Sequence, residues 1–418
     1  MPPSAGAPTK AALPNDPLSR YAFGFAFVSA AAAMVSIAVS HACLAIALVL
    51  LLVSKTRLRL PSAVWPFAGF LAWTVLSAAV SGDPAAALPQ FKKFFVFAML
   101  VVVFSLFRTL DQARRLAEAW FACAVAAALL SIVQFVQKWT AARDAGADFL
   151  TAYANDRITG FFSHWMTFSQ ALLLVFLLLA AYLLFSETGR RTGRGVWIGS
   201  SLVCGTALAL SFTRSVWIAV LAAGSYLVWH WRPKLLLAIP VALAVAFVAA
   251  PGAARQRLES IVNPSAGEAR LIMWRTGARM IAAHPWFGVG PERVGPRFRE
   301  FLPADVEALP DAYYSHLHNI YVHYAAERGL PAVVFLLWFF AQTLWGHTRA
   351  LRKLPPSARN DRRFLLQAVV AGTLAVMLVG CFDVTLGDSE VLGIYLALVA
   401  LGYRAAEIGR DQATARPA

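Results

Sequence analysis

The stretch WMTFSQALLLVFLLLAAYLLFS, residues 165–186, decides the fold class of this chain. It holds 22 residues without a single charged side chain. At a rise of about 1.5 Å per residue, a helix of this length crosses the bilayer's hydrocarbon core of about 30 Å. The apolar residues run continuously, without the alternation of a membrane β-barrel strand. The stretch therefore predicts a membrane-spanning helix, because a helix satisfies all its backbone groups internally.

Similar apolar runs recur along the whole chain. Of the 418 residues, 59% are hydrophobic and 14% are charged, against about 25% charged residues in a typical soluble domain. The mean hydropathy is +0.62. We therefore expect an all-α membrane protein that forms a single polytopic domain over residues 1–418. About twelve transmembrane helices are predicted, at residues 21–39, 41–54, 64–81, 89–107, 113–137, 165–186, 195–213, 215–231, 234–250, 319–346, 363–382 and 389–406.

The net charge of +15 is carried by short loops between the apolar runs. Alternate loops are rich in Lys and Arg, as in residues 55–59 and 349–363. Because cytoplasmic loops of membrane proteins carry this excess, we expect these loops and both tails on the cytoplasmic side. The basic residues form no single soluble face, which argues against a nucleic-acid partner.

Residues 251–318 form a large loop that we expect on the periplasmic side, since long loops cross the membrane whatever their charge. Within it, residues 268–284 have the pattern of an amphipathic helix. Arg270 falls among the apolar residues of that helix, one turn before Trp274. A solvated face explains Arg279 well but does not explain Arg270.

A histidine cluster, His316, His318 and Asn319 with His323 one turn later, follows the large loop. Histidine titrates close to neutral pH, which suits a general base. The alternative is a set of interfacial histidines at headgroup level. A zinc site is disfavoured because the H-x-H spacing is not the helical pair of zinc enzymes, and no third ligand completes it. No metal or other cofactor is therefore expected.

Three arginines are the next candidates. Arg214, in SFTRS, lies at the edge of a predicted span, where an arginine is costly and either functional or extended toward lipid headgroups. Arg270 and Arg275 lie on the loop helix, and guanidinium groups grip phosphates through two parallel hydrogen bonds. Further polar residues near the same side could bind a phosphate or a sugar, or could be ordinary loop polarity: Arg157, His164, Lys92, Lys93, Asp383 and Asp388.

The outer loops lack a D-x-D acidic pair that would hold a metal with a diphosphate. Arginine and lysine would have to neutralise any diphosphate bound there. The spans contain few charges, which weakens an ion-coupled transporter.

The segments SFTRS, R-x-x-x-W-R followed by HPWFGVG, and HNIYVHYAAERGL resemble the O-antigen ligase and polymerase superfamily over about residues 205 to 345. Within it the chain looks most like the O-antigen ligases. The resemblance implies a GT-C-like glycosyltransferase of the bacterial inner membrane, with a periplasm-facing site and no metal. Such enzymes move a glycan from undecaprenyl diphosphate to lipid A–core.

The same resemblance implies roles for individual residues. The family's essential histidine falls on His318, its loop arginine on Arg270 with Arg275 as competitor, and its membrane-edge arginine on Arg214. His316 offers a second histidine, so the base stays open between the two. Related polymerases, protein O-oligosaccharyltransferases and a non-enzymatic transporter of lipid-linked glycan are the alternatives.

Overall fold

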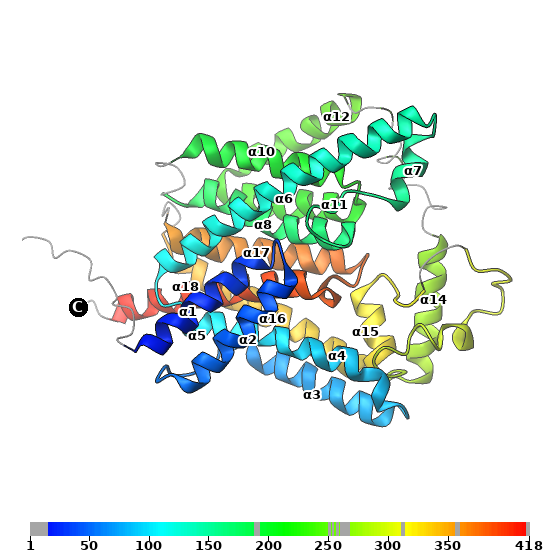
Figure 1. The fold of residues 1–418 in the computed structure, drawn as a ribbon, viewed down its shortest axis with the longest axis horizontal. Coiled ribbons are helices and arrows are strands. Elements are labelled where there is room, and N and C mark those ends of the chain that lie inside the picture. Colours follow the sequence, from blue (N-terminus) through cyan, green and yellow to red (C-terminus); the bar gives the residue numbers. More distant parts are fainter. Residues whose placement is uncertain are drawn as a thin grey trace, which may run out of the picture.

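A computed structural model describes residues 16–187, 193–249, 268–310, 314–355 and 360–414, together with Gly252, Arg255 and Glu259. Throughout these residues the regular secondary structure is helical, with no strand, as expected for an all-α membrane protein (Figure 1). Most of the predicted loop from 251 to 267 lies outside the described residues.

The first part of the chain folds into a hairpin followed by longer helices. Asp16 caps the first helix and Pro17 opens it, as helix starts favour. Thr109 and Gln112 form a reciprocal capping box at the start of α6. The elements are α1 (Pro17–Ala32), α2 (Ile37–Val53), α3 (Val64–Val80), η1 (Pro84–Ala87), α4 (Leu88–Lys93), η2 (Phe94–Phe97), α5 (Ala98–Leu106), α6 (Leu110–Asp144) and α7 (Phe149–Asn155).

The second part adds the central helices and the large loop. The predicted loop helix is present as α14, one residue shorter than expected. The elements are α8 (Trp165–Phe185), α10 (Arg194–Leu210), α11 (Arg214–Trp231), η3 (Pro233–Ala238), α12 (Ile239–Ala249), α14 (Glu268–Ala283), η5 (Phe298–Phe301), α15 (Ile320–Arg328), α16 (Leu330–Arg352), α17 (Asp361–Gly380), η6 (Thr385–Gly387) and α18 (Ser389–Thr414).

Six helical stretches among the described residues are long and apolar enough to cross a membrane: Pro84–Leu106, Leu110–Asp144, Trp165–Phe185, Leu330–Arg352, Asp361–Gly380 and Ser389–Ile408. The other six predicted spans overlap with the shorter helices α1, α2, α3, α10, α11 and α12, although the bounds of 21–39 and 234–250 differ from those of α1 and α12. The chain is thus a multi-pass helical protein, and the number twelve stays a prediction.

Four predicted spans are broken within their length: 21–39 at the turn between α1 and α2, 234–250 where η3 passes into α12, and the two that follow. The run at 89–107 passes through the 3₁₀ segment Phe94–Phe97 between α4 and α5. The run at 319–346 breaks at Gly329, which ends α15 and precedes α16. Its φ of 85° lies in the left-handed region, which interrupts the helix.

Helices α8, α17 and α18 form the centre of the bundle, with α6, α10 and α11 on one side and α3, α5 and α16 on the other (Figure 1). About four fifths of each central apolar stretch is buried, at 78%, 83% and 83%. Large side chains that are almost fully enclosed include Phe168, Phe364 and Tyr395. The packed central helices fix the positions of the polar segments at their ends.

The two ends of the bundle differ in what they carry. At one end, Arg59 pairs with Glu407 at 3.0 Å and Ser186 donates to Asp361 at 2.9 Å, so the basic loops lie beside the end of α18. The start of α1 is at this same end, where Asp16 accepts from the Lys55 N–H. At the opposite end lie α7, α14 and α15 (Figure 1). This arrangement agrees with a topology in which both tails share one side.

Candidate active site

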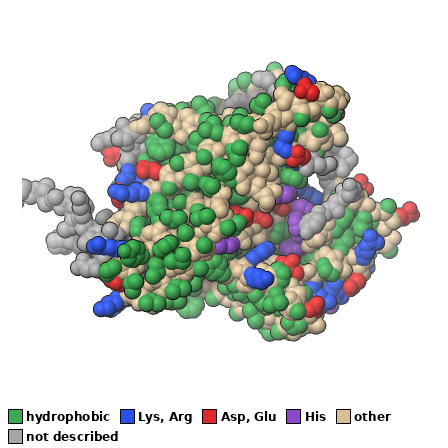
Figure 2. Space-filling view, viewed as in Figure 1, with side chains coloured by type: hydrophobic (Ala, Val, Ile, Leu, Met, Phe, Trp, Pro, Cys, Tyr) green, Lys and Arg blue, Asp and Glu red, His purple; other side chains and the backbone are tan. Residues whose placement is uncertain are grey.

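A polar cavity of about 820 Å³ opens at the end of the bundle that carries α14 and α15. Figure 2 shows histidine, basic and acidic side chains gathered there, beside a mainly apolar bundle surface. Segments far apart in the sequence line the cavity: Gln90, Lys93, Arg157, Ser163, His164, Trp165, Met166, Thr167, Thr213, Arg214, Ser215, Arg270, Glu292, Ser315, His316, His318, His323, Tyr324, Glu327, Asp383, Val384, Gly387, Asp388 and Glu390.

The HPWFGVG turn is locked onto the end of α15 by backbone hydrogen bonds. The Leu330 N–H donates to the Pro285 carbonyl at 2.8 Å, and the Val289 N–H donates to that of Ala326 at 2.8 Å. A Cβ on Gly329 would lie 1.8 Å from the Trp286 carbonyl oxygen. The glycine therefore serves the close approach of the two backbones as well as the left-handed turn.

A small core fixes α14 over the cavity. Leu317, between the two histidines, is fully buried with Ile272 and Met280 of α14. The indole N–H of Trp274 donates to the Leu317 carbonyl at 3.0 Å. The loop helix and the histidine segment therefore form one packed unit.

Three arginines from separate segments face the cavity: Arg157, Arg214 and Arg270. Burial lowers the pKa of Arg157, and the charges of Arg214 and Arg270 lower it further, while Tyr153 opposes them. Burial also lowers the pKa of Arg270, with a further contribution from Arg214 and an opposing one from Asp383. Arg157 donates to the carbonyls of Ala154 and Phe212. Partly desolvated cations that destabilise one another favour the binding of an anion between them.

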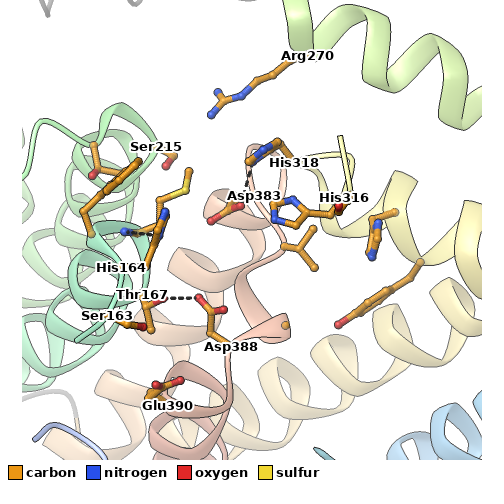
Figure 3. A pocket seen from close by; sticks show the side chains of 18 of the residues that line it. Ser163, His164, Thr167, Ser215, Arg270, His316, His318, Asp383, Asp388 and Glu390 are labelled. Carbon is orange, nitrogen blue, oxygen red and sulfur yellow. Dashed lines mark hydrogen bonds and ion pairs between the residues drawn. The ribbon is translucent and has the colours of Figure 1, made fainter. Parts of the chain in front are cut away.

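His318 lies below Arg270 and beside Asp383 (Figure 3). Its Nδ1 is 3.3 Å from Oδ1 of Asp383. The Gln170 amide donates to Oδ2 of Asp383 at 2.6 Å. Burial acts to raise the pKa of Asp383, but contact with His318 and the charge of His316 outweigh it, and the net pKa lies below its usual value. His318 has a φ of 44°, a conformation that non-glycine residues adopt mainly where the surroundings impose it.

His316 is a different kind of histidine, although its ring lies 4.4 Å from that of His318, centroid to centroid. Burial, followed by the charges of His318 and His323, lowers the pKa of His316 to about 4, against an opposing effect of Asp383. It is therefore neutral at physiological pH and a weak base.

A buried ionic cluster forms the wall on the α15 side. Glu327 is 2.9 Å from Nε of Arg328 and 3.7 Å from Nε2 of His323, and it accepts the Glu292 N–H at 2.8 Å. Arg328 also donates to Gln90 at 2.9 Å. Buried charges need such partners, so the cluster positions α15 against α4 and the loop.

The floor of the cavity is acidic. Asp388 accepts from the Thr167 hydroxyl at 2.7 Å, and Glu390 lies further down (Figure 3). Burial raises the pKa of Asp388 to about 6, against the Thr167 hydrogen bond and the charge of Lys93, with further raising effects of Asp383 and Glu390. His164 lies beside this floor, and burial lowers its pKa. The cavity thus has a cationic side toward α14 and an acidic side toward α18.

Most of the candidates from the sequence surround this one cavity: His318, Arg270, Arg214, His316, Arg157, His164, Lys93 and Asp388. Three others do not line it. Arg275 is 44% exposed and forms a two-pronged ion pair with Asp305 at 2.6 and 2.9 Å. Asn319 caps α15, and its amide donates to the Cys381 carbonyl at 3.1 Å. Lys92 is exposed on α4.

Sequence reasoning placed Asp383 in an outer turn but did not pair it with His318, and it missed Gln170, Glu292 and Glu390. Asp383 and His318 are separated by two membrane helices along the chain. Only the topology, which puts both segments at one end, could have suggested their contact.

His316, His318 and Asp383 offer ligand atoms within 4.8 Å of one another, which could hold a divalent metal. Asp383 is the third ligand that the sequence did not reveal. Arg270 is close enough to Asp383 for their charges to interact, and its positive charge opposes a dication at this position.

The fold and cavity define a multi-pass membrane protein with a charged, partly buried site at one end of its helical bundle. The family model described as O-antigen ligase matches residues 199–337, about a third of the chain. This match supports membership of the O-antigen ligase superfamily, whose members are glycosyltransferase-like enzymes. The matched region contains Arg214, Arg270 and His318, whereas Asp383 follows it. No curated protein matches the chain.

Proposed function

We propose that this protein is an O-antigen ligase that transfers a glycan from undecaprenyl diphosphate to lipid A–core. The observation that carries the proposal is one cavity that holds three arginines and the His318–Asp383 pair. We place the protein in the inner membrane with the cavity facing the periplasm, because the basic loops lie at the opposite end of the bundle.

The donor's diphosphate would bind between Arg157, Arg214 and Arg270. Its negative charges relieve the mutual repulsion of these side chains. As the glycosidic bond breaks, charge grows on the leaving diphosphate, and fixed cations in a partly dry site stabilise that charge strongly. The leaving group then needs no proton.

The acceptor hydroxyl would lie against His318. Asp383 holds the N–H of Nδ1, which leaves the lone pair of Nε2 free to accept the hydroxyl proton. The oxygen attacks the anomeric carbon of the donor sugar, and the bond to undecaprenyl diphosphate breaks with its electron pair on the phosphate oxygen. The anomeric configuration inverts in one step.

Two features of the site favour this assignment of roles. His316 is a poor base at neutral pH, since its pKa is lowered to about 4. Asp383 is a poor covalent nucleophile because His318 and Gln170 engage its two oxygens. The acidic floor near Asp388 suits a neutral, hydroxyl-rich sugar, because carboxylates accept hydrogen bonds from hydroxyl groups.

Reconstitution with undecaprenyl-diphosphate glycan and lipid A–core tests the proposal. The wild type should produce lipopolysaccharide of higher mass, with the anomeric linkage inverted. His318→Ala should abolish transfer, and Arg279→Ala, on the exposed face of α14, should retain it. A polymerase would instead lengthen the lipid-linked glycan, and a transporter would tolerate His318→Ala. Retention of the donor's anomeric configuration would exclude the one-step mechanism.

A further inference from the structure

A second polar cavity, of about 700 Å³, lies at the other end of the bundle. Four segments meet there: the start of α1, the connection after α2, the end of α5 with Arg108, and the end of α18. Its lining residues are Asp16, Ser19, Lys55, Thr56, Arg57, Leu58, Arg59, Ser105, Arg108 and Arg404.

Cations dominate this cavity. It has five basic side chains and one carboxylate, that of Asp16. The carboxylate already accepts from the N–H groups of Leu18 and Lys55 and from the Ser19 hydroxyl. Its capacity to neutralise the neighbouring lysine and arginines is therefore reduced.

The basic side chains are of two kinds. Arg404 is buried and donates to the Phe107 carbonyl and to Glu407, which also accepts from Arg59. Arg57 and Arg108 are exposed, and within the described residues their side chains have no hydrogen-bond or ion-pair partner. The cavity thus has a buried arginine, Arg404, that is held by hydrogen bonds, and two exposed arginines, Arg57 and Arg108, that are available to a ligand.

Exposed apolar side chains adjoin the cations. Leu58 lines the cavity and is 51% exposed, Leu60 follows two residues later, and Leu18 and Tyr21 lie on the first turns of α1. Val28 and Val39 of the α1–α2 hairpin are exposed as well. Basic side chains that could bind an anionic group therefore lie next to exposed apolar side chains that could contact hydrocarbon chains.

We propose that this cavity binds the phosphate of an anionic phospholipid, whose acyl chains lie along the α1–α2 hairpin. Guanidinium groups bind phosphate oxygens through paired hydrogen bonds, and basic clusters at the membrane surface attract anionic lipids. The excess of Lys and Arg in cytoplasmic loops explains why these loops are basic, but it does not explain why their side chains line a cavity. The apolar flank favours a lipid over a soluble phosphate compound, and the inference is independent of the proposed function.

Binding to the purified full-length protein in detergent tests the proposal. The probes are phosphatidylglycerol, phosphatidylcholine with the same acyl chains, and inorganic phosphate at matched ionic strength. Titration by native mass spectrometry or by thermal shift gives an affinity for each. The test variant is Arg57→Gln with Arg108→Gln, and the matched control is Arg352→Gln with Lys353→Gln, two exposed basic residues at the end of α16.

We expect phosphatidylglycerol to bind and phosphatidylcholine to bind more weakly. Loss of about fivefold in affinity per arginine removed is expected in the test variant, with little change in the control variant. Equal binding of inorganic phosphate would assign the cavity to a soluble anion and overturn the lipid assignment. Equal effects of the two double variants would show that general basic charge, and not this cavity, attracts the lipid. Helical circular dichroism of each variant checks that it is folded.

Discussion

Asp383→Asn separates a positioning role for this residue from a purely structural one. In the wild type, Oδ1 of Asp383 lies 3.3 Å from Nδ1 of His318, within ion-pair distance, and Oδ2 accepts from the Gln170 amide at 2.6 Å. Asparagine has one acceptor and one donor end. If its oxygen stays on Gln170, its NH₂ faces Nδ1 of His318, which must then become the acceptor. The proton moves to Nε2, the nitrogen that should take the substrate proton.

The size of the effect follows from these contacts. A buried donor that faces another donor loses a hydrogen bond worth about 1–3 kcal/mol, which disfavours the competent tautomer by about 5- to 150-fold. Loss of the carboxylate also removes stabilisation of the imidazolium that forms. Together these losses match the usual contribution of a general base, about 10²- to 10⁴-fold. We expect kcat to fall by this factor while the donor KM changes little.

The assay is initial-rate glycan transfer in proteoliposomes, with Asp305→Asn in the exposed loop as the matched control. Asp383→Asn should add no further loss to His318→Ala, because the two residues act as a unit. Activity of Asp383→Asn within threefold of wild type would refute the reasoning. So would a loss that adds fully to that of His318→Ala, since Asp383 would then act elsewhere.

Four other predictions follow from the structure. Arg270→Ala should lower transfer by about 10²- to 10³-fold, and Arg270→Lys should restore little, because a point charge does not replace the planar fork; near-normal rates for both would remove Arg270 from the donor site. Asp388→Asn should raise thermal stability at pH 7 but not at pH 4: a pKa raised to about 6 means that ionisation destabilises the fold as pH rises between about 4 and 6, by up to about 3 kcal/mol. A constant difference across this range would contradict that cause. Gly329→Ala should destabilise the protein by at least about 2 kcal/mol through backbone strain and a clash with Trp286, whereas Gly24→Ala, which has open space, should not; equal melting temperatures would oppose it. A cysteine in place of Arg299 should react with an impermeant reagent in spheroplasts, and the reverse pattern, with labelling only in the loop at 353–355, would invert the topology.

The long apolar helices were predictable because the length and hydropathy of each run are local properties of the sequence. Length and hydropathy of residues 165–186 suffice for α8, whatever its neighbours are. The amphipathic pattern of residues 268–284 likewise predicted α14 to within one residue. The break at Gly329 was not predicted, because it depends on a carbonyl of Trp286, more than forty residues earlier.

The site was predictable in its residue types but not in its pairings. Arg214 and Arg270 stand out because a cation at a membrane edge or on an apolar face needs a reason, and His318 stands out as part of a histidine cluster. Arg275 was the competitor of Arg270 in sequence, and the fold shows that it pairs with Asp305 at the surface. The His318–Asp383 contact is non-local and leaves no periodic signal in either segment.

The packing of the loop connects the two halves of the proposed reaction. Arg270 lies on α14, and His318 follows Leu317, which is buried against that same helix. A Cβ on Gly277 would lie 2.6 Å from Cδ1 of Leu317, so the helix and the histidine segment approach more closely than any other residue would permit without a shift. By contrast, Arg214 and Asp383 belong to the bundle. A displacement of α14 toward a bound diphosphate would therefore carry His318 with it, and the 3.3 Å contact with Asp383 would change at the same time. In the proposed reaction, donor binding and base orientation would be coupled through this packed unit, so Gly277→Val should weaken both together, whereas Arg270→Ala should leave the orientation of His318 intact.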